Sequence, residues 1–178
     1  MKWLNHLFGG PKDMVALAAG TKAPDFSLPA LDGSKFSLSE GLRQGPVVAA
    51  FFKVSCPVCQ YAFPFFDRAY KANRNHKVTF VGISQDNTRE TAAFLKEVGV
   101  TFPTLFDDPN GYAASNAYGL TNVPTWFLIG QDGTIEISSV GWVKKDLENL
   151  NARLASPQQA APPPLFLAGE DVRDFRAG

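Results

Sequence analysis

The segment from Pro46 to Cys59 constrains the fold of this 178-residue chain more than any other. The run from Pro46 to Phe52 is apolar throughout, which is typical of a strand that is buried on both faces in the middle of a sheet. Cys56-Pro57-Val58-Cys59 follows closely, and an apolar pattern of helical period begins there. Because Pro57 suits the first position of a helix, the sequence predicts a strand, a short loop and a helix that begins at the cysteine pair.

That helix is expected to be amphipathic. Its predicted apolar face consists of Val58, Ala62, Phe65, Phe66 and Ala69, and the opposite face carries Gln60, Asp67 and Lys71. The remaining elements also alternate in type. They are a hairpin in which Phe26 and Leu28 alternate before Asp32-Gly33 and Phe36 and Leu38 after it, a strand over 78–83, a helix that starts near Asn87, a short helix over 112–118, strands over 126–129 and 135–140, and a last helix through Leu147, Leu150 and Leu154. This alternation predicts an α/β domain with helices covering a sheet.

Changes in composition divide the chain into three parts. Residues 1–20 read as an extension in which Trp3, Leu4, Leu7 and Phe8 form one face of a short helix. Residues 21–155 read as the domain, and residues 156–178 as a Pro-rich linker and tail. The tail has apolar residues at Leu165, Phe166, Leu167, Val172 and Phe175, so it either folds back over its own domain or docks on a partner chain.

The overall charge excludes some classes of partner. The chain has 17 basic residues (Lys and Arg) and 17 acidic residues (Asp and Glu), so its formal net charge is zero. A balanced charge gives no broad attraction to nucleic acid or to an anionic membrane. The first twenty residues lack the uninterrupted apolar run of a signal peptide, and no stretch has the length of a transmembrane segment. We therefore expect a cytoplasmic protein, with a periplasmic or membrane-associated location as the alternative. The oligomeric state is not predicted.

The two cysteines have the spacing of a redox dithiol. Cys56 would lie at the helix N-terminus, where free amide hydrogens and the helix dipole favour a thiolate. Cys59 would lie about one turn further on, within reach of a mixed disulfide at Cys56. Two alternatives are a metal site and a pair of inert buried thiols. A zinc site is poorly supported because only His6 and His76 could complete it, at no recognised spacing, so no metal is predicted.

Further motifs in the same order strengthen this interpretation. They are Ala23-Pro24-Asp25-Phe26, Phe63-Pro64, Val81-Gly82-Ile83-Ser84, Tyr118-Gly119, Val123-Pro124-Thr125, Phe127-Leu128-Ile129, Asp132-Gly133 and Gly141. Together with the dithiol they resemble the redoxin (AhpC/TSA) branch of the thioredoxin superfamily, which includes the TlpA- and ResA-like oxidoreductases. The resemblance implies a thioredoxin-like fold, in which helices flank a central mixed β-sheet, here with an N-terminal β-hairpin. It also implies a thiol–disulfide oxidoreductase with no cofactor beyond the redox-active Cys56–Cys59 disulfide. Its partners would be a protein or small-molecule disulfide and a thiol electron donor.

The resemblance adds a substrate site beside the dithiol. Val123-Pro124 is similar to the family's cis-proline segment, which faces the dithiol. The backbone of Val123 would pair with a substrate strand, next to Pro57 and Val58. Alternatively, Pro124 simply begins a strand.

Several positions depart from the family pattern. Ser55 stands where many relatives have Trp, and Lys53 either lowers the pKa of the Cys56 thiol or is simply solvated. Ala50 and Ala62 replace carboxylates found in relatives, so no base is evident for Cys59.

Two other functions compete with disulfide exchange. The first is a peroxiredoxin-like hydroperoxide reductase. The peroxiredoxin pattern Pro-x-x-x-Thr/Ser-x-x-Cys fails at both cysteines: counting back gives Lys53 and Ala49 from Cys56, and Cys56 and Phe52 from Cys59. The second is a non-catalytic redox-sensing or interaction module.

Overall fold

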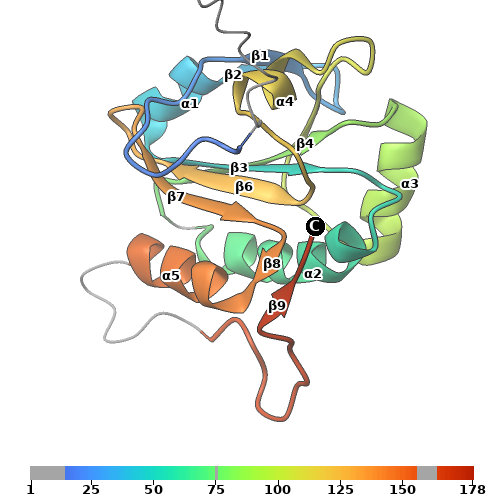
Figure 1. Ribbon diagram of the computed structural model, residues 1–178, viewed down its shortest axis with the longest axis vertical. Helices are drawn as coiled ribbons and strands as arrows, with labels where there is room; N and C mark the ends of the chain where they lie inside the picture. Colours follow the sequence, from blue (N-terminus) through green and yellow to red (C-terminus); the bar gives the residue numbers. More distant parts are fainter. Residues whose placement is uncertain (1–14, 75, 156–163) are drawn as a thin grey trace, which may run out of the picture.

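The computed structural model describes residues 15–74, 76–155 and 164–178. Within these residues a five-stranded sheet has the order β5-β4-β3-β6-β7 (Figure 1). Strands β3, β4 and β5 are parallel, and β6 and β7 are each antiparallel to their neighbour. The sheet strands are β3 (Val47–Phe52), β4 (Thr79–Ser84), β5 (Thr104–Phe106), β6 (Thr125–Ile129) and β7 (Ile135–Val140). The dithiol follows β3, the middle strand of this sheet.

Elements cover both faces of the sheet, as Figure 1 shows. On one side lie α1 (Leu38–Gln44), α4 (Ala113–Ala117) and the hairpin of β1 (Ser27–Pro29) and β2 (Lys35–Ser37). The other side carries α2 (Pro57–Ala72), α3 (Thr88–Val98) and α5 (Lys144–Leu154), with the pair β8 (Trp142–Val143) and β9 (Phe175–Arg176) at its edge.

The apolar run of β3 is explained by these two layers. Val48, Ala50 and Phe52 belong to a core with the α2 side chains, and the alternate residues from Val47 to Phe51 belong to a core on the other face. Successive side chains of a strand point to opposite faces, so a strand covered on both sides must be apolar at every position. This arrangement confirms the predicted mixed α/β fold and its N-terminal hairpin.

Three details differ from the sequence-based expectations. The segment after β2 is helical from Leu38, because Ser37 caps α1 and accepts a hydrogen bond from the Glu40 amide, so Leu38 is not in the hairpin. Strands β5, β8 and β9 were not predicted. The third concerns Asp67, which the helical pattern assigned to the polar face of α2. It is only 3% exposed, because its carboxylate accepts hydrogen bonds from the amide and hydroxyl of Thr101.

The ends of the chain bear on two further expectations. The predicted helix through Trp3 and Phe8, and the linker over 156–163, lie outside the described residues. The described tail packs on its own domain, where Leu165 is buried and Phe166 contacts Phe65 at a ring-centroid distance of 5.5 Å. Of the two alternatives for the tail, the structure therefore has the one that folds back.

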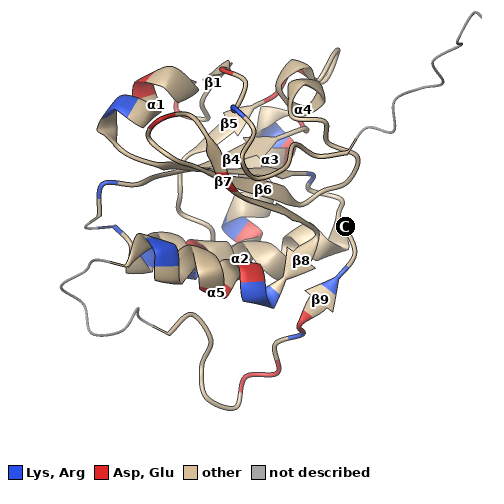
Figure 2. Ribbon diagram, turned by 60° about the vertical axis from the view of Figure 1, so that its left-hand side comes forward, with Lys and Arg blue, Asp and Glu red and all other residues tan. Residues whose placement is uncertain are grey.

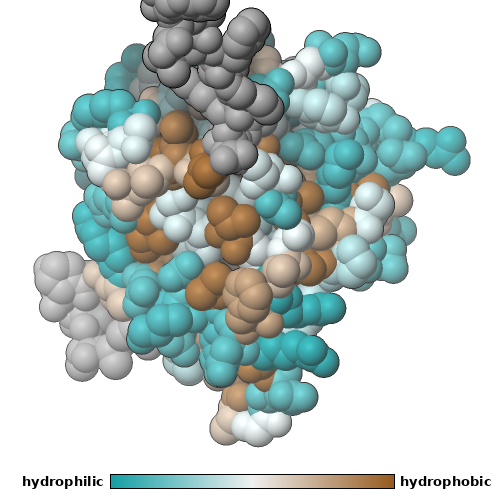
Figure 3. Space-filling view, viewed as in Figure 1, coloured by the Kyte–Doolittle hydropathy of each residue, from teal (hydrophilic) through white to brown (hydrophobic). Residues whose placement is uncertain are grey.

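The surface carries charges of both signs. Both α2 and α5 carry basic and acidic residues (Figure 2), and on the face seen in Figure 1 apolar side chains are interspersed with polar ones (Figure 3). Among the described residues, no helix combines the length and apolarity that a membrane crossing requires.

Candidate active site

The first turn of α2 holds Cys56 in the position predicted for it. Cys56 is the N-cap, with extended backbone angles of φ −82° and ψ 115°, and Pro57 follows at the first helical position. The Cys56 Sγ accepts a hydrogen bond from the Cys59 amide at 3.4 Å, and the Cys56 carbonyl accepts one from the Gln60 amide at 3.1 Å. The sulfur thus takes the capping place that a Ser or Asp oxygen usually occupies, where partial positive charge favours an anion.

The two thiols differ in their access to solvent. Cys56 is half-buried, whereas Cys59 is completely buried in the core beneath α2. Burial raises the pKa of the Cys59 thiol well above its ordinary value, and the nearby Cys56 and Asp86 raise it further. A hydrogen bond with the Lys53 backbone acts in the opposite direction but is outweighed. At neutral pH, therefore, Cys59 is protonated and Cys56 is the accessible sulfur.

The loop that leads into β6 contacts the dithiol. The Val123–Pro124 peptide bond is cis, as the family resemblance implied. The Cys56 thiol donates a hydrogen bond to the Val123 carbonyl oxygen at 3.2 Å. The loop reaches the dithiol because β6 begins beside the end of β3, with Thr125 opposite Phe51.

The other predicted site residues surround the pair. Pro57 and Ser55 are exposed, and Val58 is half-buried. The Lys53 carbonyl accepts a hydrogen bond from the Cys56 amide at 3.2 Å, while the Lys53 ammonium lies 5.8 Å from the centre of the Tyr112 ring. The tuning of Cys56 by Lys53 stays a prediction.

Asp86 is a carboxylate near the dithiol that the sequence analysis did not single out. The expectation that no base is evident for Cys59 stays a prediction. Asp86 lies in the loop after β4, and its Oδ2 accepts a hydrogen bond from the Val54 amide at 2.7 Å. Its negative charge contributes to the raised pKa of Cys59. Strands β3 and β4 are parallel neighbours, so their carboxyl ends meet at one edge of the sheet. That adjacency was the available signal for Asp86.

The metal alternative gains no support from this geometry. Over the described ranges, no three His, Cys, Asp or Glu side chains are placed to share a metal ion. The His76 ring contacts Asn73 at 3.0 Å, and His6 lies outside the described residues.

Comparison with known proteins places the chain among redox proteins of one family. The AhpC/TSA family model matches residues 19–138. The chain belongs to the AhpC/TSA family. The thiol-disulfide oxidoreductase ResA of Bacillus subtilis is 28% identical over 132 residues, which cover 74% of this chain and 70% of that protein. A putative thiol:disulfide interchange protein DsbE from Chlorobium tepidum has a crystal structure that matches with a TM-score of 0.67 and 31% identity, covering 76% of this chain and 94% of that one.

AhpC/TSA membership and these relatives confirm the predicted resemblance and the enzyme class, a thioredoxin-like oxidoreductase. Another similar structure bears on the choice of chemistry within the AhpC/TSA family. It is the peroxidoxin BcpB of Mycobacterium tuberculosis, with a TM-score of 0.64 and 25% identity over 76% of this chain and 97% of that one.

Proposed function

We propose that the protein exchanges disulfides with a substrate through Cys56 as the nucleophile and Cys59 as the resolving thiol. The Cys56 thiolate attacks one sulfur of a substrate disulfide, so that a Cys56–substrate disulfide forms and the other substrate sulfur leaves as a thiolate. Cys59 then loses its proton and attacks the Cys56 sulfur. This step forms the Cys56–Cys59 disulfide and releases the second substrate thiol. A dithiol electron donor returns the pair to the reduced state, and no other cofactor is part of the proposal.

The position of the Cys56 sulfur is the observation that carries this proposal. It lies between the Cys59 amide and the Val123 carbonyl, at the half-exposed N-terminus of α2. A thiolate there is stabilised by the helix terminus, which is the condition for a reactive cysteine. The buried Cys59 is shielded from outside reagents yet lies one helical turn away, as a resolving thiol should.

Val123 is proposed to align the substrate. Val123 is half-buried and its carbonyl lies beside the Cys56 sulfur, so an extended substrate segment could pair with its backbone while the substrate disulfide meets the sulfur. Pro57 and Val58 would contact the substrate from the helix side. The names of ResA and DsbE support a disulfide as the substrate class.

The test is to trap the mixed disulfide. Reduced Cys59→Ser protein incubated with a peptide that contains one disulfide should accumulate a covalent adduct at Cys56, seen as a mass increase and mapped by digestion. Cys56→Ser is the matched control and should form no adduct, because the remaining thiol is buried and protonated. An adduct at Cys59 in that control would refute the assigned roles.

Peroxide reduction is a second candidate because of the similarity to BcpB. In that reaction the Cys56 thiolate would attack hydrogen peroxide and form a sulfenic acid with release of water, and Cys59 would then displace a second water to form the disulfide. Rapid mixing of the reduced protein with hydrogen peroxide separates the two candidates. A rate many orders of magnitude above that of a free thiolate would favour peroxide reduction over disulfide exchange.

The direction of electron flow depends on the compartment. In a reducing cytosol the dithiol would act as a reductase, whereas in an oxidising periplasm it would be kept oxidised or be recycled by a partner. The reduction potential of the Cys56–Cys59 pair, measured against glutathione buffers, distinguishes these roles.

A further inference from the structure

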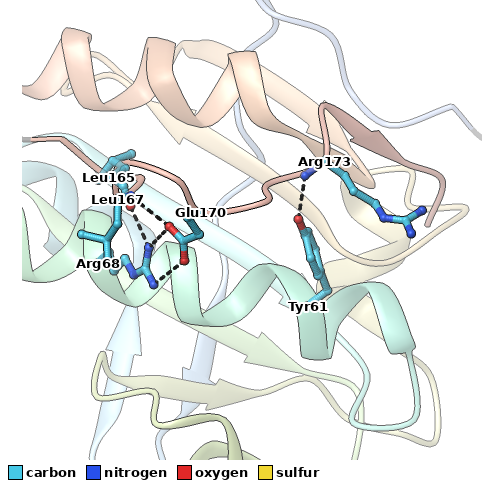
Figure 4. A network of polar contacts seen from close by, with 6 residues as sticks. All are labelled: Tyr61, Arg68, Leu165, Leu167, Glu170 and Arg173. Atoms are coloured by element: carbon cyan, nitrogen blue, oxygen red, sulfur yellow. Dashed lines mark hydrogen bonds and ion pairs between the residues drawn. The ribbon is translucent and has the colours of Figure 1, made fainter.

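The tail is attached to α2 at a point remote from the dithiol. The Arg68 guanidinium forms a two-pronged ion pair with Glu170, with N–O distances of 2.7 and 2.8 Å, and also donates to the Leu165 carbonyl at 3.1 Å (Figure 4). Glu170 in turn accepts a hydrogen bond from the Leu167 amide at 2.9 Å. Because the Leu165 side chain is buried in the α2 core, this attachment is both apolar and ionic.

From there the tail runs towards the N-terminus of α2. The Arg173 amide donates to the Tyr61 hydroxyl at 2.9 Å, as Figure 4 shows, and the Arg173 carbonyl accepts from the Trp142 indole at 2.6 Å. Beyond this point β9 pairs with β8, with Trp142 opposite Arg176. The Arg176 guanidinium lies over the Tyr61 ring, 4.7 Å from its centre. The path is thus fixed by backbone as well as side-chain contacts.

The last residues of this path lie against the cis-proline loop. A Cβ atom built on Gly178 would lie 2.7 Å from the Val123 carbonyl oxygen, and one built on Gly141 would lie 2.6 Å from the Arg176 carbonyl oxygen. The Asn122 side chain also donates to the Gly178 carbonyl at 3.0 Å. The tail therefore reaches the same carbonyl that receives the Cys56 thiol hydrogen bond. In Figure 1 the end of β9 accordingly lies beside the loop that leads into β6.

We propose that Phe175–Gly178, here called the strap, is a substrate-selecting element that favours low-molecular-weight disulfides over polypeptide disulfides. An extended polypeptide that pairs with the Val123 backbone needs the surface against which Gly178 lies. Cys56 itself stays half-exposed, so a small disulfide reaches it without moving the strap. This inference rests on the proposed function, since it specifies the substrate class of the same site.

Displacing the strap would break a small set of contacts, namely the pairing of β9 with β8, the stacking of Arg176 on Tyr61 and the hydrogen bond from Asn122 to the Gly178 carbonyl. The ion pair between Arg68 and Glu170 lies upstream of the strap, so it can hold the rest of the tail in place when the strap lifts. The side chain of Phe175 is 62% exposed, which means that little apolar surface holds the strap down. A polypeptide would therefore bind only after displacing it, and its reaction would be slowed by that step.

The experiment removes Phe175–Gly178 and compares two substrates. The second-order rate constants of the reduced protein are measured with oxidised glutathione and with a disulfide-bonded polypeptide such as insulin. The deletion should raise the polypeptide rate about tenfold, equivalent to about 1.4 kcal/mol, and change the glutathione rate less than about twofold. Leu167→Ala is the matched control, because Leu167 is an exposed tail residue outside the strap and its loss should change neither rate.

A second readout does not depend on enzymatic turnover. Cys56 is alkylated with iodoacetamide or with a 5-kDa polyethylene-glycol maleimide, and the site is confirmed by peptide mapping. The deletion should raise the rate of Cys56 alkylation by the larger reagent only.

The results separate the two proposals. If glutathione is exchanged but the deletion alters neither the rate ratio nor the alkylation ratio, the strap proposal is refuted and the proposed function stands. A lower polypeptide rate after deletion would also refute it, because the strap would then help to bind the substrate. If no disulfide is exchanged by any variant, the proposed function fails and the alkylation ratio alone decides whether the strap restricts access.

Discussion

Asp67→Ala should destabilise the fold strongly, although a helical pattern places this residue on the polar face. Its carboxylate is 4% exposed and accepts two hydrogen bonds from Thr101, at 2.6 Å from the amide and 2.9 Å from the hydroxyl. A hydrogen bond to a charged group contributes about 1.5–3 kcal/mol. Because Thr101 is exposed and can partly rebind water, we expect a total loss of about 2–3 kcal/mol for both bonds.

The assay is urea unfolding followed by tryptophan fluorescence, together with thermal unfolding. For a domain of this size, the expected loss corresponds to a fall in Tm of about 5–10 °C. Lys71→Ala is the control. It removes only the ion pair with Asp67, in which the Lys71 side chain is half-exposed, so it should lower the free energy of unfolding by about 0.5 kcal/mol. Equal effects of the two substitutions would refute the reasoning, since the Thr101 bonds would then contribute nothing.

Three further predictions concern titrating groups. Resolution of the mixed disulfide by Cys59 should accelerate about tenfold per pH unit from pH 6 to 9. The reason is that burial raises the pKa of Cys59, so its thiolate fraction is still growing in this range. The rate is measured by stopped flow, and a plateau below pH 8 would contradict this prediction. Asp86→Asn should accelerate that step at pH 7, because it removes a negative charge that raises the pKa of Cys59 while leaving an acceptor for the Val54 amide; an unchanged rate in the same assay would exclude the effect. Hydrogen bonds from Arg68 and then from the Leu167 amide lower the pKa of Glu170 from 4.5 to about 2, so its stabilisation of the tail is complete above about pH 4.5 and is lost as the pH falls towards 2. The NMR chemical shift of the Leu167 amide should change through this pH transition, and the substitution Glu170→Gln should abolish that pH-dependent change.

The features that could be predicted from the sequence are those with a local signal. The apolar run of β3 indicates burial on both faces, and Pro57 after Cys56 indicates a helix start; both hold in the structure. The cis bond before Pro124 has no local signal and came from the family resemblance. The missed helix α1 did have a local signal, Ser37 with Glu40 three residues later, but the alternation of Phe36 and Leu38 suggested a strand.

The features that were missed depend on contacts between distant segments. Asp67 is buried because Thr101, far along the chain, provides its donors. Asp86 approaches Cys59 only through the pairing of β3 with β4. The course of the tail depends on its antiparallel pairing with Trp142, which no pattern within the tail encodes.

The position of Gly178 beside the cis-proline loop has a consequence for protein engineering. Anything fused after Gly178 would emerge next to Val123 and Cys56. A purification tag at that position would stand beside the reactive sulfur and alter the rates it was meant to help measure. The same geometry offers a tool, because a short linker that carries a disulfide-bearing peptide would be presented to Cys56 at a millimolar effective concentration. Such a fusion would turn a weak encounter into an intramolecular reaction whose rate reports directly on the sulfur.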